Sequence, residues 1–532
     1  MTPLFFLAQS LFQDIKKYFV PTGPWGYFYE HSKHSYVPNA FDTMILVPYF
    51  AILIVMALFG AHRYHLVYLY LKHKKPTPEP VPFAELPPVT IQLPIYNEMY
   101  VVERLIQAVS RIDYPAHLLE IQVLDDSTDE TQSVSRACVE QYRGMGFDIH
   151  YIHRNNREGY KAGALEEGLK TARGEFVAIF DADFVPNPDF LYKTIHHFTE
   201  PKVAVVQTRW GHINREYNQL TEAEAIILDG HFIIEHGARY HTGRFFNFNG
   251  TAGIWRKVAI HDAGGWQHDT LTEDTDLSYR AQLKGWKFVY LPDVVCPAEL
   301  PVEVNAFKTQ QFRWAKGLVQ TAIKLLPSVF CSKFPWKIKM ESFFHLGANC
   351  SYPLMVLFSM IFLPAMIVRF YQGWFQMLYI DLPLFLLATF SISIFYLVSQ
   401  RELFPDTWMR SFRHLPFIMS VGIGLSVSNS RAVFEALIGR KTAFTRTPKY
   451  AILSDKDKPT QKNRYRGKSG YTPYFELGLG IYFLLAIVYA LSNENYATVP
   501  FLMLFVDGFI YFGFMSLFQT RLGKYWGHKP SH

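Results

Sequence analysis

The sequence contains little cysteine and little charge. Only four cysteines occur in 532 residues and no two of them form a CxxC pair, so neither a zinc site nor a disulfide framework is indicated. Isolated cysteines fit a reducing compartment, where they act as small buried hydrophobic residues. Charged residues make up 18% of the chain and the net charge is only +6. Lysine and arginine are scattered without a stacking platform, which argues against nucleic-acid binding.

Apolar and aromatic residues are abundant instead, at 49% and 17% of the chain. The mean hydropathy is +0.02. This composition is too apolar for a purely soluble protein and too charged for one made only of membrane spans. We therefore expect a soluble domain joined to a membrane region.

Residues 44–61 carry no charge and are long enough to span a bilayer. They lie too far from the N-terminus for a cleavable signal peptide, and the basic residues after them predict a cytoplasmic end and an outside N-terminus.

Residues 417–438 are apolar but lie between basic loops, so we expect an interfacial helix there. A stripe from Phe5 to Phe19 predicts a helix, either on the membrane surface or packed on other spans. The remaining predicted spans, which bring the total to about five, are 345–368, 377–399, 475–492 and 498–518.

The positive-inside rule divides the chain into cytosolic and membrane parts. Asp507 lies in the last predicted span, where a carboxylate serves either structural pairing or substrate contact. The predicted parts are an N-terminal amphipathic segment with the first span at 1–75, a cytosolic domain with interfacial helices at 76–342, two spans at 343–400, a cytosolic interfacial helix and loop at 401–472, and two spans with a cytosolic tail at 473–532.

Residues 89–292 alternate β-rich runs with helical stretches, which predicts a mostly parallel sheet covered by helices. The expected strands are 89–94, 119–126, 147–153, 175–183 and 203–210, and the expected helices include 98–111 and 158–172. Ligands bind beyond the carboxyl ends of such strands. Two acidic motifs, Asp125-Asp126 and Asp181-Ala182-Asp183, end two of these strands and indicate a site for a cation or a ligand rich in donors.

Each motif has a functional and a plain interpretation. The Asp181-Ala182-Asp183 motif could chelate Mg²⁺ or Mn²⁺ together with phosphate oxygens, or form an ordinary turn. The Asp125-Asp126 motif could bond a ribose or base, or cap the next helix. Arg154, Arg157 and Lys161 precede a helix and suit a diphosphate, although a solvated basic turn is the alternative.

A second group of motifs suits proton transfer and sugar binding. Asp274 begins a helix whose positive end should keep the carboxylate ionised, so it is the candidate general base, with a helix cap as the alternative. Gln310, Arg313 and Trp314 share one helical face. Arginine could grip a diphosphate and tryptophan could stack on a sugar, whereas an interfacial Arg-Trp pair is the alternative. Residues 249–253 and Trp266 could approach a ligand, or form a turn and core.

These motifs, in this order and before the later spans, resemble processive membrane glycosyltransferases of family two, within the cellulose synthase superfamily. The resemblance covers roughly residues 40–520. Segments such as IQVLDDSTD, GYKAGAL and FNGTAGIWR look most like the cellulose synthase-like A and C proteins, which make β-1,4-mannan or glucomannan and the β-1,4-glucan backbone of xyloglucan. The implied fold is an α/β GT-A-type (Rossmann-like) cytosolic glycosyltransferase domain combined with an α-helical transmembrane region of about five spans.

The resemblance implies roles residue by residue. Residues 444–449 resemble the mobile gating loop of cellulose synthases, which closes over bound nucleotide. The implied roles are nucleotide and diphosphate binding for Tyr96, Glu98, Asp125, Asp126, Lys161, Gln310 and Arg313; metal binding for Asp181 and Asp183; catalysis for Asp274 as base with Glu273; acceptor binding for Asn249, Gly250, Thr251, Trp266 and Trp314; and gating for Phe444, Thr447 and Lys449.

The sequence also departs from bacterial cellulose synthases. Phe184 replaces a histidine beside the metal, Asn249 replaces a cysteine near the acceptor, and Arg446 replaces a valine in the gating loop. We also expect no cyclic-di-GMP-binding domain after the spans. These differences argue against strict cellulose synthesis and against regulation by cyclic-di-GMP, but they leave the residues expected for glycosyl transfer in place.

The resemblance implies an inverting, metal-dependent transfer from UDP-glucose or GDP-mannose to a β-linked polysaccharide that leaves through a channel formed by the spans. Accessory export proteins are conceivable partners besides the bilayer. We expect a multi-pass protein of a bacterial inner membrane rather than a Golgi membrane, because no extended disordered tails are evident. The alternatives are a non-processive enzyme that glycosylates a membrane lipid and a catalytically silent scaffold or transporter.

Overall fold

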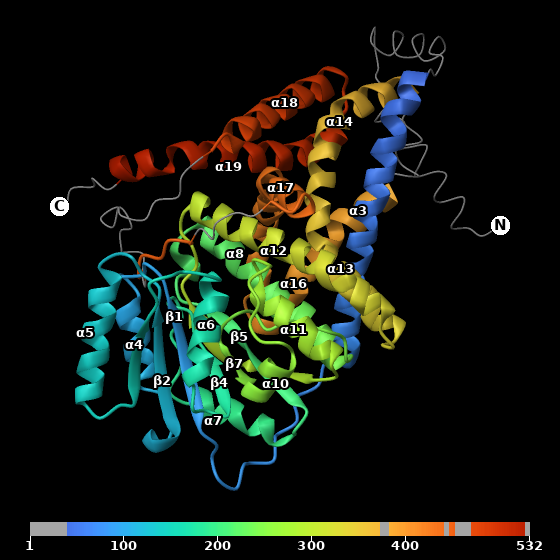
Figure 1. The fold of residues 1–532 in the computed structure, drawn as a ribbon. Helices are drawn as coiled ribbons and strands as arrows, with labels where there is room; N and C mark the ends of the chain where they lie inside the picture. Colours follow the sequence, from blue (N-terminus) through green and yellow to red (C-terminus); the bar gives the residue numbers. More distant parts are fainter. Residues whose placement is uncertain (1–39, 373–381, 441–445, 453–469, 527–532) are drawn as a thin grey trace.

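A computed structural model describes residues 40–372, 382–440, 446–452 and 470–526. The predicted stripe from Phe5 to Phe19 therefore lies outside the described residues. A domain built on one β-sheet forms one end of the molecule, and long apolar helices form the other (Figure 1). Helix α12 (Val304–Cys331) lies between them.

The sheet contains seven strands in the order β3-β2-β1-β4-β6-β5-β7. All neighbouring pairs are parallel except those of β6, which is antiparallel to β4 and β5. The strands are β1 (Val89–Ile95), β2 (Leu119–Asp125), β3 (Ile149–His153), β4 (Phe176–Ile179), β5 (Val203–His212), β6 (Gly253–Arg256) and β7 (Lys287–Ala298).

Helices cover both faces of this sheet, because its strands are apolar on both sides. One hydrophobic cluster joins the sheet to α4 and α7, and a second joins the opposite face to α6, α10 and α11. The helices of this domain are α4 (Val102–Val109), α5 (Thr131–Gly144), α6 (Tyr160–Thr171), α7 (Phe190–Ile195), α8 (Gln219–Gly230), α9 (Gly237–His241), α10 (Lys257–Asp262) and α11 (Glu273–Leu283), with a π-helical turn at His231–His236.

The five strands expected from the sequence are present, but β6 and β7 were not foreseen. β6 has only four residues and lies in a segment that also fits a turn. The strand expected at 175–183 ends at Ile179, so Asp181 and Asp183 belong to the turn beyond it. The helix expected at 98–111 is shorter, because α4 begins at Val102.

Among the described residues, five helical segments are long and apolar enough to cross a membrane: 40–73, 336–370, 408–437, 472–492 and 496–519. They include α3 (Ala40–His73), α13 (Trp336–Gly347), α14 (Ser351–Gln372), α17 (Leu415–Leu437), α18 (Thr472–Ser492) and α19 (Val499–Trp526), whereas α16 (Ser391–Leu403) is not among them. In Figure 1, α18 and α19 lie side by side, and α3 lies beside α14. Buried aromatic and aliphatic side chains join α3, α14, α18 and α19 in one apolar cluster. The number of segments agrees with the expected five spans.

The five segments are not the same five that the sequence predicts as membrane spans. Residues 408–437 qualify by length and composition, although we expected an interfacial helix at 417–438. In this segment 72% of the most apolar stretch is buried, against 22–39% in the other four, so α17 packs among its neighbours rather than at the edge. Part of the predicted span 377–399 lies outside the described residues. The domain boundaries and the topology stay predictions.

Two buried ion pairs attach α12 to the membrane helices. Lys308 Nζ lies 2.7 Å from Glu476 Oε1 on α18, and Lys316 Nζ lies 3.0 Å from Glu435 Oε2 on α17. Lys316 also donates to the carbonyl of Arg440 at 2.7 Å. Because buried charges are costly unless paired, these contacts fix α12 relative to the helices around it.

Candidate active site

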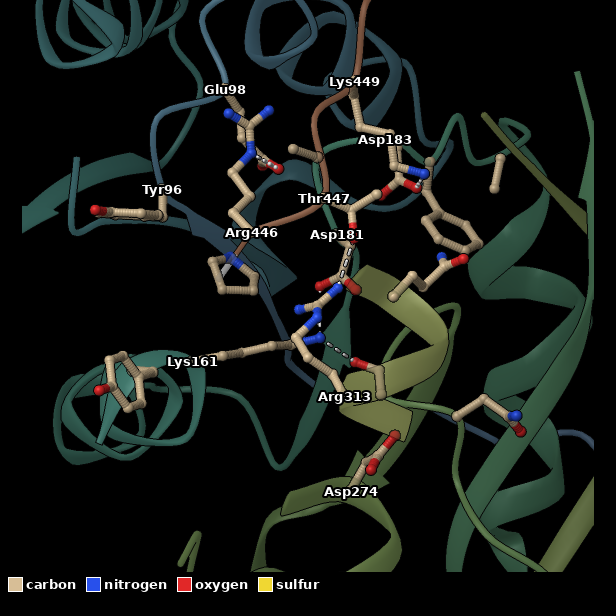
Figure 2. A pocket seen from close by; sticks show the side chains of 18 of the residues that line it. Tyr96, Glu98, Lys161, Asp181, Asp183, Asp274, Arg313, Arg446, Thr447 and Lys449 are labelled. Carbon is tan, nitrogen blue, oxygen red and sulfur yellow. Dashed lines mark hydrogen bonds and ion pairs between the residues drawn. The ribbon is translucent and has the colours of Figure 1, made fainter. Parts of the chain in front are cut away.

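A cavity of about 200 Å³ opens where the carboxyl ends of the parallel strands meet the helices that face them (Figure 2). Strands β1, β2, β4, β5 and β7 lead into it, and so does the segment before β6. Most predicted site residues line this cavity: Tyr96, Glu98, Asp126, Lys161, Asp181, Asp183, Asn249, Gly250, Glu273, Asp274, Gln310, Arg313, Trp314, Thr447 and Lys449.

Three predicted site residues do not line the cavity. Asp125 is fully buried, and its carboxylate accepts hydrogen bonds from the Ser127 amide at 2.8 Å and the Tyr151 hydroxyl at 3.0 Å. The Thr251 hydroxyl accepts from the Asp181 amide at 2.9 Å. Trp266 is buried and packs edge-to-face on Trp255. These contacts support the site from behind rather than reach a ligand.

The two aspartates after β4 each hold an ammonium group. Lys161 Nζ lies 2.5 Å from Asp181 Oδ1, and Lys449 Nζ lies 2.8 Å from Asp183 Oδ2 (Figure 2). Burial raises the pKa of Asp181, and Lys161 opposes this shift. Two cations at two carboxylates show that this turn attracts positive charge.

The opposite end of the cavity is formed by residues after β1 and β3. Arg154 forms a two-pronged ion pair with Asp126, in which its Nε donates to Oδ1 at 2.8 Å. The Arg157 guanidinium lies 3.3 Å from the centre of the Tyr96 ring. Both arginines were expected at a diphosphate, but only Lys161 reaches the acidic turn after β4. Arg154 instead neutralises Asp126, and Arg157 extends the flat face of Tyr96.

Asp274 lies in the first turn of α11. Its Oδ1 accepts from the Thr275 amide at 2.7 Å, whereas Thr272, at the N-cap, makes no side-chain capping bond. The structure therefore shows no side-chain capping bond from the residue at the N-cap of α11. Burial raises the pKa of Asp274, and the charge of Glu273 raises it further. This differs from our expectation that the helix terminus keeps the carboxylate ionised: burial and a like charge outweigh the helix dipole here.

Gly250 brings the chain before β6 close to this base. Its φ is +80°, and a Cβ at this position would lie 2.9 Å from Asp274 Oδ2 and 3.4 Å from Lys161 Nζ. The Gly250 carbonyl accepts from Lys161 at 2.9 Å. Only glycine permits this conformation and this close approach without strain.

Helix α12 presents Gln310, Arg313 and Trp314 to the same cavity, as their shared helical face predicts. Arg313 Nη2 donates to the Thr447 hydroxyl at 2.8 Å. Burial lowers the pKa of Arg313 to about 10, and the carboxylates around the cavity oppose this shift. Arg313 remains a cation at neutral pH and faces the acidic turn after β4.

Residues 446–452 close one side of the cavity. Arg446 Nε donates to Glu98 Oε1 at 3.0 Å, and Lys449 also donates to the carbonyl of Glu299 at 2.5 Å. Burial raises the pKa of Glu98 to about 7, and Arg446 opposes this shift. Phe444, predicted to take part in gating, lies outside the described residues.

Sequence reasoning missed several groups around this segment. Glu299 follows β7, and its carboxylate pairs with Arg104 at 3.0 Å and accepts from the Tyr450 amide at 2.9 Å. Recognition of β7 would have placed Glu299 at a strand end. Within the described part of the chain, the buried carboxyl of Glu224 on α8 has no hydrogen-bond partner, and burial raises its pKa to about 8. No sequence periodicity indicates that Glu224 lies near the site.

Comparisons with known proteins show which family and which relatives this domain is similar to. Residues 87–317 match the family described as "Glycosyltransferase like family 2". Glucomannan 4-beta-mannosyltransferase 7 of Arabidopsis thaliana is 40% identical over 295 residues, which are 54% of this chain and 53% of that protein. Glucomannan 4-beta-mannosyltransferase 1 of Cyamopsis tetragonoloba is 45% identical over 253 residues, which are 46% of this chain and 48% of that protein. The chain spans about half the length of the curated relatives it matches.

A solved structure shows a related fold. The mannosyltransferase PcManGT from Pyrobaculum calidifontis, solved in complex with GDP-Man and Mn²⁺, has 20% sequence identity and a TM-score of 0.50. The match covers 74% of this chain and 100% of that chain. At this identity, the likeness concerns the fold alone.

The sheet, the acidic turn and the family match define this domain as a GT-A-type glycosyltransferase domain, which is combined with helices long and apolar enough to cross a membrane. Within that class, residues 87–317 match glycosyltransferase family 2, and the predicted resemblance to the cellulose synthase-like mannan and glucan synthases is confirmed.

Proposed function

We propose that the protein is an inverting, processive β-glycosyltransferase that adds hexose units from UDP-glucose or GDP-mannose to a growing glycan. One observation carries this proposal. The carboxylate of Asp274 lies in the same cavity as the acidic turn of Asp181 and Asp183 and the α12 residues Arg313 and Trp314. A base, a phosphate-binding end and a sugar-stacking ring are the parts that glycosyl transfer requires.

In the proposed reaction, the acceptor hydroxyl gives its proton to Asp274 while its oxygen attacks the anomeric carbon of the donor. The bond from that carbon to the diphosphate breaks on the opposite face, and the nucleoside diphosphate leaves with the bonding electrons. An α-linked donor therefore yields a β-linked product. Lys161 and Arg313 stabilise the charge that develops on the leaving group, and Trp314 orients the acceptor ring.

A divalent metal fits the acidic turn. Among the residues that the structure describes, no group of three or more His, Cys, Asp and Glu side chains is placed to hold a metal ion. Mg²⁺ and Mn²⁺ commonly use only one or two carboxylates together with substrate phosphates, and Asp181 and Asp183 supply them. Both already hold ammonium groups, which indicates a cation site. When bound, the metal would neutralise diphosphate charge.

The curated relatives support a β-1,4-linked mannan or glucan as the product, since their names describe glucomannan 4-beta-mannosyltransferases. Donor choice depends on contacts to individual hydroxyl groups, and the nucleoside end of the cavity offers both an aromatic face at Tyr96 and a carboxylate at Glu98. GDP-mannose and UDP-glucose are therefore both donors to test.

A second cavity, of about 240 Å³, supports export of the product through the membrane helices. Its wall is rich in aromatic side chains, on which sugar rings stack. The two cavities share walls: Leu228 and Trp314 line the first, while Ile227 and Gln311 on the same two helices line the second. The aromatic residues of the second cavity are Phe59, Phe307, Tyr352, Phe358, Tyr396, Phe501 and Phe505.

The proposed location is a membrane with the glycosyltransferase domain in the cytosol and the glycan leaving on the other side. The bacterial inner membrane expected from the sequence stays a prediction, and the two curated relatives named above are plant proteins. The bilayer, the nucleotide sugar and the glycan are the proposed partners, and any accessory export protein remains to be tested by copurification.

Purified protein in detergent or nanodiscs, incubated with UDP-glucose or GDP-mannose and with or without Mn²⁺, tests the proposal. We expect metal-dependent nucleotide release and long chains that a specific β-glucanase or β-mannanase degrades. A single organic-extractable glycolipid as the product would support the non-processive alternative. No nucleotide release with any donor would support a silent scaffold or transporter and overturn the proposal.

A further inference from the structure

The side chain of Asn249 is held by two histidines. Asn249 lies immediately before Gly250 and lines the active-site cavity. Its Oδ1 lies 2.6 Å from His236 Nε2, and its Nδ2 lies 2.9 Å from His231 Nε2. The Asn249 backbone amide also donates to Gln207 Oε1 at 2.8 Å. Both the backbone and the carboxamide of this residue are therefore fixed.

The surroundings determine where the hydrogens lie. His236 Nε2 also lies 3.1 Å from the Asn247 carbonyl, which only accepts, so His236 Nε2 carries the hydrogen. It consequently donates to the Asn249 oxygen, and the Asn249 amide nitrogen donates to His231 Nε2. The other nitrogen of His231 then donates to Glu235 Oε2, at 2.8 Å. This single consistent assignment excludes the flipped orientation of the amide.

The π-helical turn at His231–His236 makes this grip possible. In an α-helix, residues five apart point roughly 140° away from each other. The wider π-turn, with its i to i+5 hydrogen bonds, brings such residues back toward the same side. Both rings therefore reach one carboxamide. Short π-turns inside α-helices are frequent at functional sites, and this one lies between α8 and α9.

The grip is fixed from behind by buried ion pairs. Glu235 Oε2 lies 3.4 Å from Arg239 Nη1, and Arg239 Nε donates to Glu341 Oε1 at 2.9 Å. Glu341 Oε2 lies 3.1 Å from His62 Nε2 on α3. Arg239 and Glu341 are both buried. The orientation of Asn249 is thus connected to an apolar helix of the membrane region.

We infer that His231 and His236 are positioning residues that fix the Asn249 carboxamide so that it binds two neighbouring hydroxyl groups of the acceptor sugar. One N–H and one oxygen lone pair of Asn249 have no partner within the described part of the chain. A hydroxyl group both donates and accepts, so a vicinal pair on a pyranose matches one donor beside one acceptor. This inference deepens the proposed function and rests on it.

The test is the kinetics of elongation of added β-1,4-linked oligosaccharides, measured in nanodiscs at saturating donor. His231→Ala should raise the KM for the acceptor about tenfold, the loss expected for one positioned hydrogen bond, and raise the donor KM much less. His231→Gln should restore much of the acceptor affinity, because its carbonyl accepts from Asn249 and its amide donates to Glu235. The exposed His117, changed to Ala, is the matched control and should leave both KM values unchanged.

A double-mutant cycle separates positioning from general structural damage. If His231 acts through Asn249, the acceptor KM of the double variant His231→Ala with Asn249→Ala should equal that of Asn249→Ala alone. The inference would be overturned if the two substitutions raised the acceptor KM independently, so that their fold-changes multiplied in the double variant. Equal changes in the donor and acceptor KM, or a failure of His231→Gln to restore the acceptor KM, would also overturn it. Failure of the proposed function is distinguishable, because the unmodified protein would then release no nucleotide from either donor, or would form a glycolipid and leave the added oligosaccharides unextended.

Discussion

Lys449 Nζ lies 2.8 Å from Asp183 Oδ2, so an ammonium group occupies one of the two carboxylates that would hold a metal ion. Lys449 belongs to the segment 446–452, whereas Asp183 follows β4. We expect a divalent cation at Asp183 to repel this ammonium group and to weaken its ion pair. The position of the segment and the occupation of the metal site are therefore coupled.

Removing this ammonium should strengthen metal binding. We expect Lys449→Met to tighten Mn²⁺ binding by about tenfold, or ~1.4 kcal/mol, because no cation then competes for Asp183. Electron paramagnetic resonance of free Mn²⁺ measures this directly, without turnover. Lys170→Met is the control, since Lys170 is exposed and pairs with Glu167. An unchanged affinity in Lys449→Met would contradict the coupling.

Asp274→Asn should abolish transfer while sparing the donor site. We expect a fall in kcat of about 10²–10⁴-fold, the usual contribution of a positioned general base. Nucleotide binding, measured by calorimetry, should stay close to that of the unmodified protein. Asp269→Asn, at a largely exposed carboxylate paired with Lys324, should leave both quantities unchanged. Retained turnover in Asp274→Asn would remove this residue from its proposed role.

The acidic limb of the pH profile should report the pair Glu273 and Asp274. A base must be ionised to act, and burial together with Glu273 raises the pKa of Asp274. Activity should therefore be lost at a higher pH than for an ordinary carboxylate as the solution is acidified. Glu273→Gln removes the like charge, so the limb should move to lower pH. If the acidic limb lies at the same pH in a folded Glu273→Gln variant, the limb reports the ionisation of another group.

Gly250→Ala should impair activity more than stability. The substitution meets a left-handed backbone at φ +80° and places Cβ 2.9 Å from Asp274 Oδ2. Gly243→Ala is a matched control, because Gly243 has φ +63° but nothing within 4 Å of an added Cβ. Both variants should lose about 1 kcal/mol of stability. Only Gly250→Ala should also lose transfer activity; equal activity in the two variants would contradict the close approach to the base.

Much of this site could be predicted because its signals are local. A hydrophobic run that ends in Asp181-Ala182-Asp183 predicts both a strand and its acidic end, and a helix period places Gln310, Arg313 and Trp314 on one face. The partner of each charge was not predictable in the same way. Arg154 follows β3 and reaches Asp126 because β2 and β3 are parallel neighbours, and such pairing depends on sheet order rather than on sequence spacing.

Two elements show the physical limit of sequence patterns. Strand β6 has four residues, too few for a periodicity to be recognised, yet its antiparallel pairing places Gly250 beside Asp274. Helix α17 is apolar, which suits either a span or a helix enclosed by others. Its largely buried surface reflects contacts with α12, α14 and α19, and these come from distant parts of the chain.

The buried ion pairs of α12 give a further prediction. Lys308→Met leaves Glu476 without its partner and should lower stability by about 3–5 kcal/mol. The double variant Lys308→Met with Glu476→Leu should recover most of this loss, as read by thermal unfolding in detergent. If the single and double variants unfold at the same temperature, the loss does not arise from the unpaired carboxylate.

The same two ion pairs bear on how a polymer could advance. Lys308 and Lys316 lie on either side of Gln310, Arg313 and Trp314, and each is bound to a different membrane helix. A helix fastened on both sides of its functional residues cannot slide along its axis without breaking buried charges. Trp314 therefore keeps its position relative to α17 and α18. If the protein elongates a glycan as proposed, lengthening by one sugar would displace the glycan past a stationary ring, and would not require a movement of the helix that carries Trp314.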